Sequence, residues 1–195
     1  QANGALGISN VVNAVDLVNG WLEVRTDAPT SFAARNVRVR NNTTGSAIFV
    51  DRDVTGPLGI GGSLINQTVT FGTILREAGA NGAVFTFAGR NGYGVSGSTT
   101  GLAAGDYRGY TLTNNSSGTV TINGNPFNHN NTNVVTFTAG GNAETIINGS
   151  ILASTTAAHV FTKSGTGTLI YAGTAGTYAG PTNISAGTLS FSDVG

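Results

Sequence analysis

The sequence has no cysteine and no methionine, and only 9% of its residues are charged. Without cysteine, neither disulfides nor thiolate chemistry is available, so the chain must be held together by backbone hydrogen bonds and packing. The strong helix formers Met, Lys and Glu are absent or nearly so, which disfavours helix. No run of about 18 apolar residues occurs, so a membrane-spanning helix is not expected. No signal peptide is visible either.

Charge of either sign is scarce, and the formal net charge is zero. A neutral surface has little Coulombic self-repulsion, which permits self-association, and it offers no attraction for nucleic acid or acidic membranes. The one basic cluster is Arg35, Arg38 and Arg40. In an extended segment, Arg38 and Arg40 share one strand face, which indicates a solvated face or, alternatively, a contact for an anionic polymer.

What the sequence does contain is glycine (30 residues), Asn, Thr and recurring β-branched residues, with 39% of the chain hydrophobic. Short apolar or alternating runs recur about every 9 to 13 residues between Gly, Asn and Ser turns, a cadence that fits an all-β sandwich, barrel or solenoid. Asn at the corners and few prolines favour the solenoid. The predicted strands are Trp21–Arg25, Val37–Arg40, Ala47–Val50, Leu64–Phe71, Ala83–Phe87, Tyr110–Thr113, Thr119–Ile122, Val134–Thr138, Thr145–Ile147, His159–Thr162, Thr168–Tyr171, Thr182–Ile184 and Thr188–Phe191.

Two segments allow other interpretations. Gly72–Ala80 is the one plausible helix. Asn148-Gly149 is typical of a two-residue hairpin turn, but it fits a solenoid corner equally well. Residues 1–60 lack the later strand pattern, so they are expected to form an N-terminal cap or divergent coils, with residues 61–195 forming the solenoid coils. The chain begins at Gln1, which suggests a processed or excised piece of a longer protein.

A Gly-Thr pair leads into an alternating apolar strand at Gly118, Gly167 and Gly187, and the 20-residue step between the last two is a plausible coil length. Residues 161–191 resemble the autotransporter-associated β-strand repeat, also called the passenger-associated transport repeat. The matching positions are Lys163, Gly165, Gly167, Thr168, Leu169, Gly173, Tyr178, Gly180, Thr182, Ile184, Gly187, Thr188 and Leu189.

The resemblance implies a right-handed parallel β-helix that is secreted to the bacterial cell surface or beyond, and no catalytic residue belongs to the motif. It also implies that further coils of the same protein continue the stack. From the residues themselves, Leu169 and Tyr171 should lie on one strand face, and Ile184 and Leu189 should re-enter the core. Tyr178 would cover the open side of the coil.

Residues that could support catalysis are few. Asp51 and Asp53 would share one strand face, as paired carboxylates of polysaccharide hydrolases do, but a turn with a neutralising Arg52 explains them as well. His129 and His159 look like surface or packing residues. The sequence therefore predicts no catalytic residue, no cofactor and no metal site, and it assigns no ligand-binding residue.

Three functions follow as expectations. The first is a non-enzymatic structural segment of an extracellular shaft, sheath or filament that associates with itself or with further coils. The second is an adhesin that binds surface glycans through loops 89–110 and 123–133, with Trp21, Tyr93, Tyr107 and Tyr110 as a possible sugar-stacking platform. The third is a β-helical polysaccharide lyase or hydrolase that uses Asp51 and Asp53.

Overall fold

The computed structural model describes residues 14–39, 45–52, 64–76, 81–97, 108–124, 127–129, 136–149, 151–153, 159–173 and 179–192. Within these ranges every regular element is a β-strand. The strands are β1 (Ala14–Leu17), β2 (Trp21–Arg25), β3 (Thr30–Phe32), β4 (Asn36–Val39), β5 (Ser46–Asp51), β6 (Thr68–Phe71), β7 (Ile74–Arg76), β8 (Asn81–Gly89), β9 (Gly94–Gly97), β10 (Arg108–Asn115), β11 (Val120–Ile122), β12 (Phe127–His129), β13 (Thr136–Gly141), β14 (Thr145–Ile147), β15 (Ile151–Ala153), β16 (Val160–Lys163), β17 (Thr168–Tyr171), β18 (Thr182–Ile184) and β19 (Thr188–Phe191).

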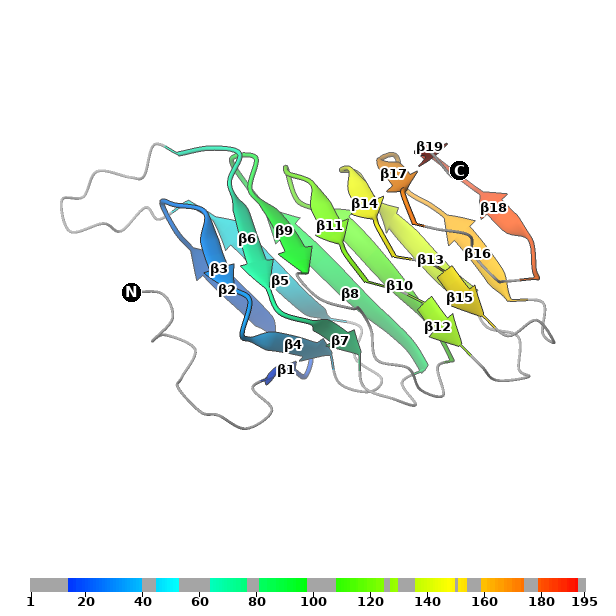
Figure 1. Cartoon of the computed structure of the whole chain (residues 1–195), viewed down its shortest axis with the longest axis horizontal. Helices are drawn as coiled ribbons and strands as arrows, with labels where there is room; N and C mark the ends of the chain where they lie inside the picture. Colours follow the sequence, from blue (N-terminus) through cyan, green and yellow to red (C-terminus); the bar gives the residue numbers. More distant parts are fainter. Residues whose placement is uncertain are drawn as a thin grey trace.

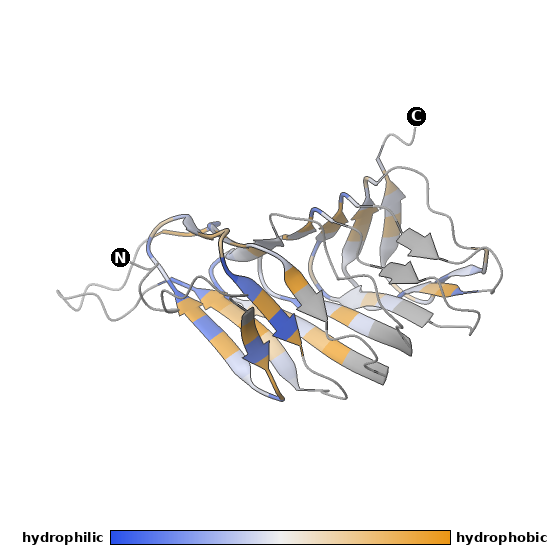
Figure 2. Ribbon diagram, turned by 60° about the horizontal axis from the view of Figure 1, so that its bottom comes forward, coloured by the Kyte–Doolittle hydropathy of each residue, from blue (hydrophilic) through white to orange (hydrophobic). Residues whose placement is uncertain are grey.

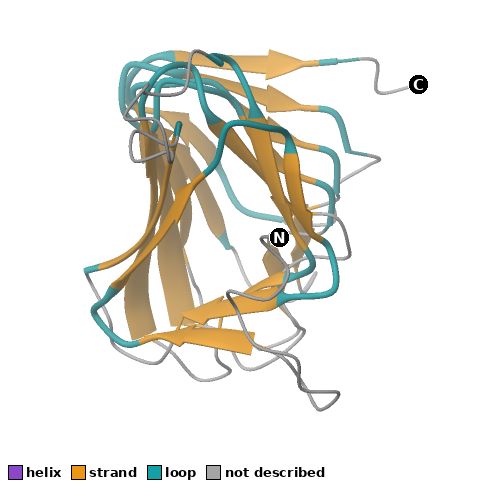
Figure 3. Ribbon diagram, turned by 90° about the vertical axis from the view of Figure 1, so that its left-hand side faces the viewer, coloured by secondary structure: helices purple, strands orange, loops and turns teal. Residues whose placement is uncertain are grey.

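The strands stack in parallel into the faces of a solenoid, and the chain advances along its axis from β1 to β19 (Figure 1). One seven-stranded sheet has the order β18-β16-β13-β10-β8-β5-β2, and a second has the order β19-β17-β14-β11-β9-β6-β3. The sheet β1-β4-β7 and the pair β12-β15 add a third face, which gives the three-sided outline of Figure 3. This connectivity is that of a parallel β-helix, so the predicted fold class is confirmed.

Alternating residues build the core because successive side chains of a strand point to opposite faces. On β6, Val69 and Phe71 are fully buried, whereas Thr68 and Thr70 are not. The Phe71 ring stacks in register on that of Phe32, with ring centroids 5.6 Å apart. Figure 2 shows the same alternation as hydrophobic and hydrophilic bands along the strands. Each buried apolar row stabilises the stack by about 25 cal/mol per Å² removed from water.

Every predicted strand segment overlaps an observed strand. Strands β1, β3, β7, β9, β12 and β15 were not among the predicted strand segments, because they are short or, like Gly94–Gly97, rich in glycine. The predictions that match to the residue are Trp21–Arg25, Thr145–Ile147, Thr168–Tyr171, Thr182–Ile184 and Thr188–Phe191.

The helical interpretation of Gly72–Ala80 is wrong where the segment is described. Ile74–Arg76 forms β7 and pairs in parallel with Val37–Val39 of β4. Ile74 is buried beside this pairing, so stacking on the previous turn outweighs the local helix preference. Residues 77–80 lie outside the described ranges.

Asn148-Gly149 is a solenoid corner and not a hairpin. The flanking strands pair with other turns, β14 with β11 and β17, and β15 with β12. At this corner Asn148 Nδ2 donates to Asn123 Oδ1 over 2.8 Å, and Asn123 Nδ2 donates to Ser96 Oγ over 3.2 Å. The stacked polar side chains expected at the corners are therefore present along this edge.

The boundary expected between residues 60 and 61 lies outside the described residues. On its N-terminal side, β2 and β5 belong to the first seven-stranded sheet, and β3 belongs to the second. These strands continue the register of the later turns, for example where Ile48 of β5 pairs with Phe87 of β8.

The repeat predicted from Gly118, Gly167 and Gly187 is confirmed by the register. Val120 pairs with Thr145, Thr145 with Leu169, and Leu169 with Leu189, the last over a step of 20 residues. Gly118, Gly167 and Gly187 each lie two residues before the aligned residue of their turn, which is Val120, Leu169 or Leu189. Gly165 and Gly187 have φ angles of 72° and 71°, a backbone conformation that L-residues with a Cβ rarely adopt.

We expect Gly165→Ala to lower the free energy of unfolding by at least about 2 kcal/mol, because it adds left-handed strain and a backbone clash. A Cβ at Gly165 would meet the carbonyl oxygen of Gly141 in the turn below. Chemical denaturation followed by circular dichroism measures the change. Gly20→Ala is the matched control, since a Cβ there meets nothing nearer than 4.0 Å. Equal effects of the two substitutions would contradict the stacked corner.

Candidate functional site

Asp51 of the expected carboxylate pair holds a corner in place. Its side chain is buried at the end of β5, and Oδ1 accepts hydrogen bonds from the Arg52 backbone NH (2.8 Å) and from Asn91 Nδ2 (2.6 Å). Asp51 therefore links one turn to the corner of the next. Asp53 lies outside the described residues, so the pairing of the two carboxylates stays a prediction.

The two histidines lie on different parts of the solenoid. His159 precedes β16 and is only 1% exposed, in agreement with its interpretation as a packing residue. His129 ends β12, on the third face of the solenoid, where its backbone pairs with Ala153. The structure thus places the two residues on different faces.

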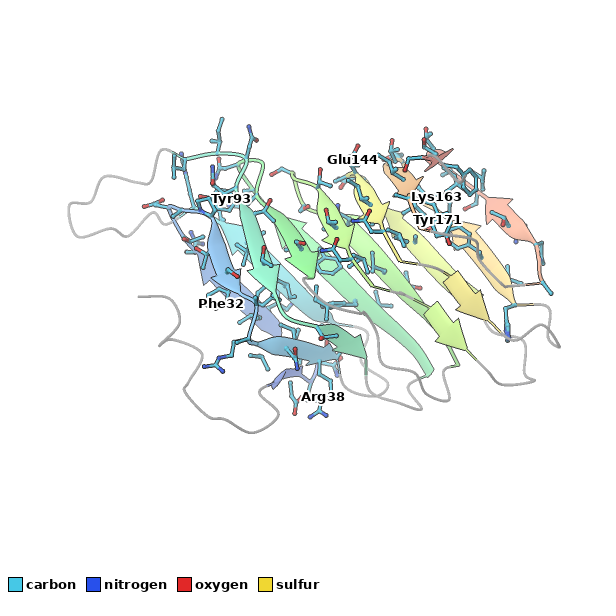
Figure 4. All side chains as sticks on the ribbon, in the orientation of Figure 1. Phe32, Arg38, Tyr93, Glu144, Lys163 and Tyr171 are labelled. Atoms are coloured by element: carbon cyan, nitrogen blue, oxygen red, sulfur yellow. The ribbon has the colours of Figure 1, made fainter. Side chains whose placement is uncertain are left out.

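Among the described residues, the aromatic side chains of the expected sugar-stacking platform do not lie together on the surface. Tyr93 is fully buried, and its hydroxyl donates to the Thr26 carbonyl over 2.6 Å (Figure 4). Trp21, by contrast, is 68% exposed on β2, at the N-terminal end of its sheet. Tyr107 lies outside the described residues, and Tyr110 forms part of β10.

The first loop assigned to the adhesin hypothesis, residues 89–110, starts as a tight corner. Asn91 and Gly92 have positive φ angles of 55° and 76°, and Tyr93 N donates to the Arg90 carbonyl over 3.0 Å. Tyr93 packs inward from this corner, so residues 90–93 form a packed turn between β8 and β9. Residues 98–107, 125–126 and 130–133 of the two loops lie outside the described ranges.

The basic cluster forms an ion pair on the outer face of β4. Val37 and Val39 are buried and Arg38 faces outward, as the alternation predicts. Arg38 Nε and Nη2 donate to the two carboxylate oxygens of Asp16 at 2.6 and 3.0 Å (Figure 4). This arrangement agrees with a solvated strand face. Arg40 lies outside the described residues.

Among the residues that the structure describes, no three His, Cys, Asp or Glu side chains come together in a way that could hold a metal ion. No helix in the described ranges is long and apolar enough to span a membrane.

Lys163, the one lysine of the chain, holds the glycine corner of the C-terminal repeat. It lies on β16, is 2% exposed, and points into the corner (Figure 4). Its Nζ donates to the carbonyls of Ser164 (2.6 Å), Gly165 (2.9 Å) and Ala186 (3.3 Å). The first two carbonyls belong to its own turn and the third to the next, so a single ammonium group bridges successive turns. Burial lowers the pKa of this group below 10.5.

The C-terminal turn ends in strands whose inward residues are exposed. Ile184 pairs with Lys163 in an inward column and Phe191 pairs with Tyr171, yet both side chains are 57% exposed. Leu189 is partly buried against the core. The prediction that Ile184 re-enters the core is therefore wrong in this structure, because no described strand pairs with the outer edge of β18. Tyr178 lies outside the described residues.

The corner between the two large sheets shortens along the solenoid. Phe85, Leu112 and Ala139 are aligned in one sheet, and Val95, Val120 and Thr145 are aligned in the other. The number of residues between the two sheets falls from nine (Phe85 to Val95) to seven (Leu112 to Val120) and five (Ala139 to Thr145). The corner between β10 and β11 is therefore longer than the corner between β13 and β14 in the next turn, and it projects beyond that corner. A polar groove of about 480 Å³ lies at this step, lined by Gly89, residues 115–119 and residues 142–144.

Buried Asn114 joins the two corners that line the groove. Its Nδ2 donates to the Glu144 carbonyl over 2.6 Å, and its own carbonyl accepts from Asn142 N (2.9 Å) and Ala143 N (3.2 Å). The side-chain oxygen of Asn114 also accepts from the backbone NH of Ser116 over 3.0 Å. Sequence reasoning treated these residues as simple turn punctuation and missed the groove. A buried Asn followed by a long polar corner was the available signal.

These features define the class of the protein, a parallel β-solenoid with glycine and asparagine corners. Its C-terminal turn is more specific: the family model described as Passenger-associated-transport-repeat matches residues 161–191. The resemblance seen in the sequence is thereby confirmed for this segment, which forms one turn of the β-helix. No curated protein and no solved structure matches the chain.

We expect Lys163→Met to lower the free energy of unfolding at pH 7 by about 1–2 kcal/mol, because three carbonyl groups lose a charged donor. The lowered pKa of Lys163 adds a pH dependence. Between that pKa and 10.5 the unfolded chain binds more protons, so wild-type stability should rise with pH relative to the variant. Urea denaturation from pH 7 to 11 measures both effects. Thr162→Val, on the opposite strand face, should change neither, and a Lys163→Met chain of unchanged stability would contradict the bridge.

We expect Tyr93→Phe to cost about 1 kcal/mol at pH 7, because the hydrogen bond to Thr26 is lost. Burial, followed by the negative charges of Asp27 and Asp51, raises the pKa of Tyr93 above 10.0. The native state then retains a proton that the unfolded chain releases, so wild-type stability falls as pH rises above 10. The variant should lack this component of alkaline destabilisation. Parallel stability curves for the two proteins between pH 9 and 12 would contradict the assignment.

Proposed function

We propose that this chain is a non-enzymatic structural segment of an extracellular bacterial surface protein, in which the solenoid forms part of a shaft, sheath or filament. The observation that carries the proposal is the difference between the two ends of the stack. At the N-terminal end the inward residues Leu17, Val24 and Phe32 are at most 8% exposed, and the inward residues Val15 and Leu22 are partly buried. At the C-terminal end Ile184 and Phe191 are both 57% exposed.

The C-terminal turn has what a further parallel turn requires. The outer edges of β18 and β19 carry backbone N–H and C=O groups that can extend the ladders. Beside them, Phe191 already makes an edge-to-face contact with Tyr171, with ring centroids 6.0 Å apart. Another turn would cover these side chains in the same columns. The low surface charge of the chain opposes such stacking very little.

The match of residues 161–191 to a passenger-associated repeat supports a surface or secreted location. A glycine-cornered parallel stack is also well suited to a mechanical role. Its turns are joined by many backbone hydrogen bonds, and it holds its shape without disulfides, as a cysteine-free chain must. An adhesin that binds glycans is a second candidate, favoured by the polar groove at the corner step.

We expect the isolated chain to associate reversibly through its C-terminal turn. Sedimentation velocity over a concentration series should show dimers that form end to end. Ile184→Lys/Phe191→Lys should raise the dissociation constant at least about a hundredfold, because two large apolar side chains are no longer buried.

Ile65→Lys is the matched control for this experiment, since Ile65 is 54% exposed, about as much as the two target residues, but precedes β6, which is not an end strand of its sheet. It should leave the association unchanged. Monomers at every concentration of the wild-type chain, seen by sedimentation and electron microscopy, would count decisively against stacking at the C-terminal end.

A further inference from the structure

The groove at the corner step presents groups that hydrogen-bond in both directions. Its walls carry the exposed amides of Asn115 and Asn142, the Ser117 and Thr119 hydroxyls and the Glu144 carboxylate. Amides and hydroxyls donate and accept, whereas the carboxylate accepts only. A ligand for such a surface must therefore carry several groups that can both donate and accept, as the hydroxyls of a sugar do.

The charge of the lining residues further restricts the chemical type of ligand. Among the residues that the structure describes, Glu144 is the one ionisable residue that lines the groove, and no Lys, Arg or His lines it. The carboxylate disfavours anions such as phosphates, sulfates and uronic acids by Coulombic repulsion. Glu144 Oε1 accepts from Thr119 Oγ1 over 3.1 Å, which orients the carboxylate. A carboxylate has about four lone-pair sites, so others remain to accept from a pair of vicinal hydroxyls.

The groove is also held in shape before any ligand arrives. Asn114 joins the β10–β11 corner to the β13–β14 corner, and Ser117 joins the β10–β11 corner to the preceding turn, at the end of β8. Ser117 N donates to the Gly89 carbonyl over 3.0 Å, and Ser117 Oγ accepts from Gly92 N over 2.8 Å. A preformed site loses little conformational entropy on binding, which favours even a small polar ligand.

We propose that this groove binds a neutral or N-acetylated sugar unit of a surface polysaccharide, with Glu144 as the principal hydrogen-bond acceptor. The volume of about 480 Å³ lies within the range of roughly 300–1,000 Å³ typical of small-molecule sites. The groove is open, and its described lining residues include no aromatic side chain, so a single sugar binds weakly. Several copies on an assembled surface would bind a polymer more tightly through effective concentration.

The test is a titration of the isotopically labelled chain with methyl glycosides of glucose, galactose and N-acetylglucosamine, followed by backbone amide NMR shifts. Glucuronic acid serves as the anionic probe and glucosamine as the cationic one. We expect shifts confined to residues 115–119 and 142–144 with at least one neutral glycoside. Glu144→Gln should weaken that binding roughly tenfold, because a charged acceptor is lost. Glu23→Gln, at an exposed glutamate of β2, should leave it unchanged.

Three outcomes would overturn the inference. The first is the absence of any shift at neutral-sugar concentrations on the order of 0.1 M, where even millimolar binding saturates. The second is binding of glucuronic acid as strong as that of the neutral sugars, or binding of glucosamine alone. The third is an unchanged affinity in Glu144→Gln. The same titration of the Ile184→Lys/Phe191→Lys chain separates sugar binding from end-to-end association, so either proposal can fail without the other.

Discussion

The structure depends on one constraint: each turn must lie in register on the turn before it. The parallel ladders satisfy the backbone groups, and the same register stacks like side chains on like, as Phe71 on Phe32 and Asn148 on Asn123. A turn by itself cannot bury its apolar face, so stability comes from the contact between neighbours. For this reason the residues that hold turns together are also those that define the fold.

The requirement for register is strictest at the corners, because the backbones of successive turns approach each other most closely there. At the C-terminal repeat a column of glycines admits the next turn, and the buried ammonium of Lys163 joins the carbonyls of two turns. Earlier turns perform the same task with neutral groups, such as Asn114 between the β10–β11 and β13–β14 corners. A motif that looks like a string of glycines and one lysine thus encodes a specific contact between successive turns.

A regular core leaves the surface free to vary. The inward columns continue unbroken while the corner between the two large sheets shortens from nine residues to five. The extra residues project outward and form a polar step without disturbing the ladders. Loops carried on a rigid scaffold are where binding residues commonly lie. A structural role for the core and a binding role for its corners are therefore compatible in one chain.

The sequence by itself determined the fold class, most strand positions and the C-terminal repeat, because alternation of apolar residues and Gly or Asn corners are local patterns. It determined neither which residues meet across turns nor which ends are covered. The burial of Tyr93 and the strand at Ile74–Arg76 follow from contacts between residues far apart in the chain, whereas Ile184 is exposed because no described strand pairs with the outer edge of β18. The polar groove likewise arises from the difference in length between two corners, which appears only when the turns are stacked in register.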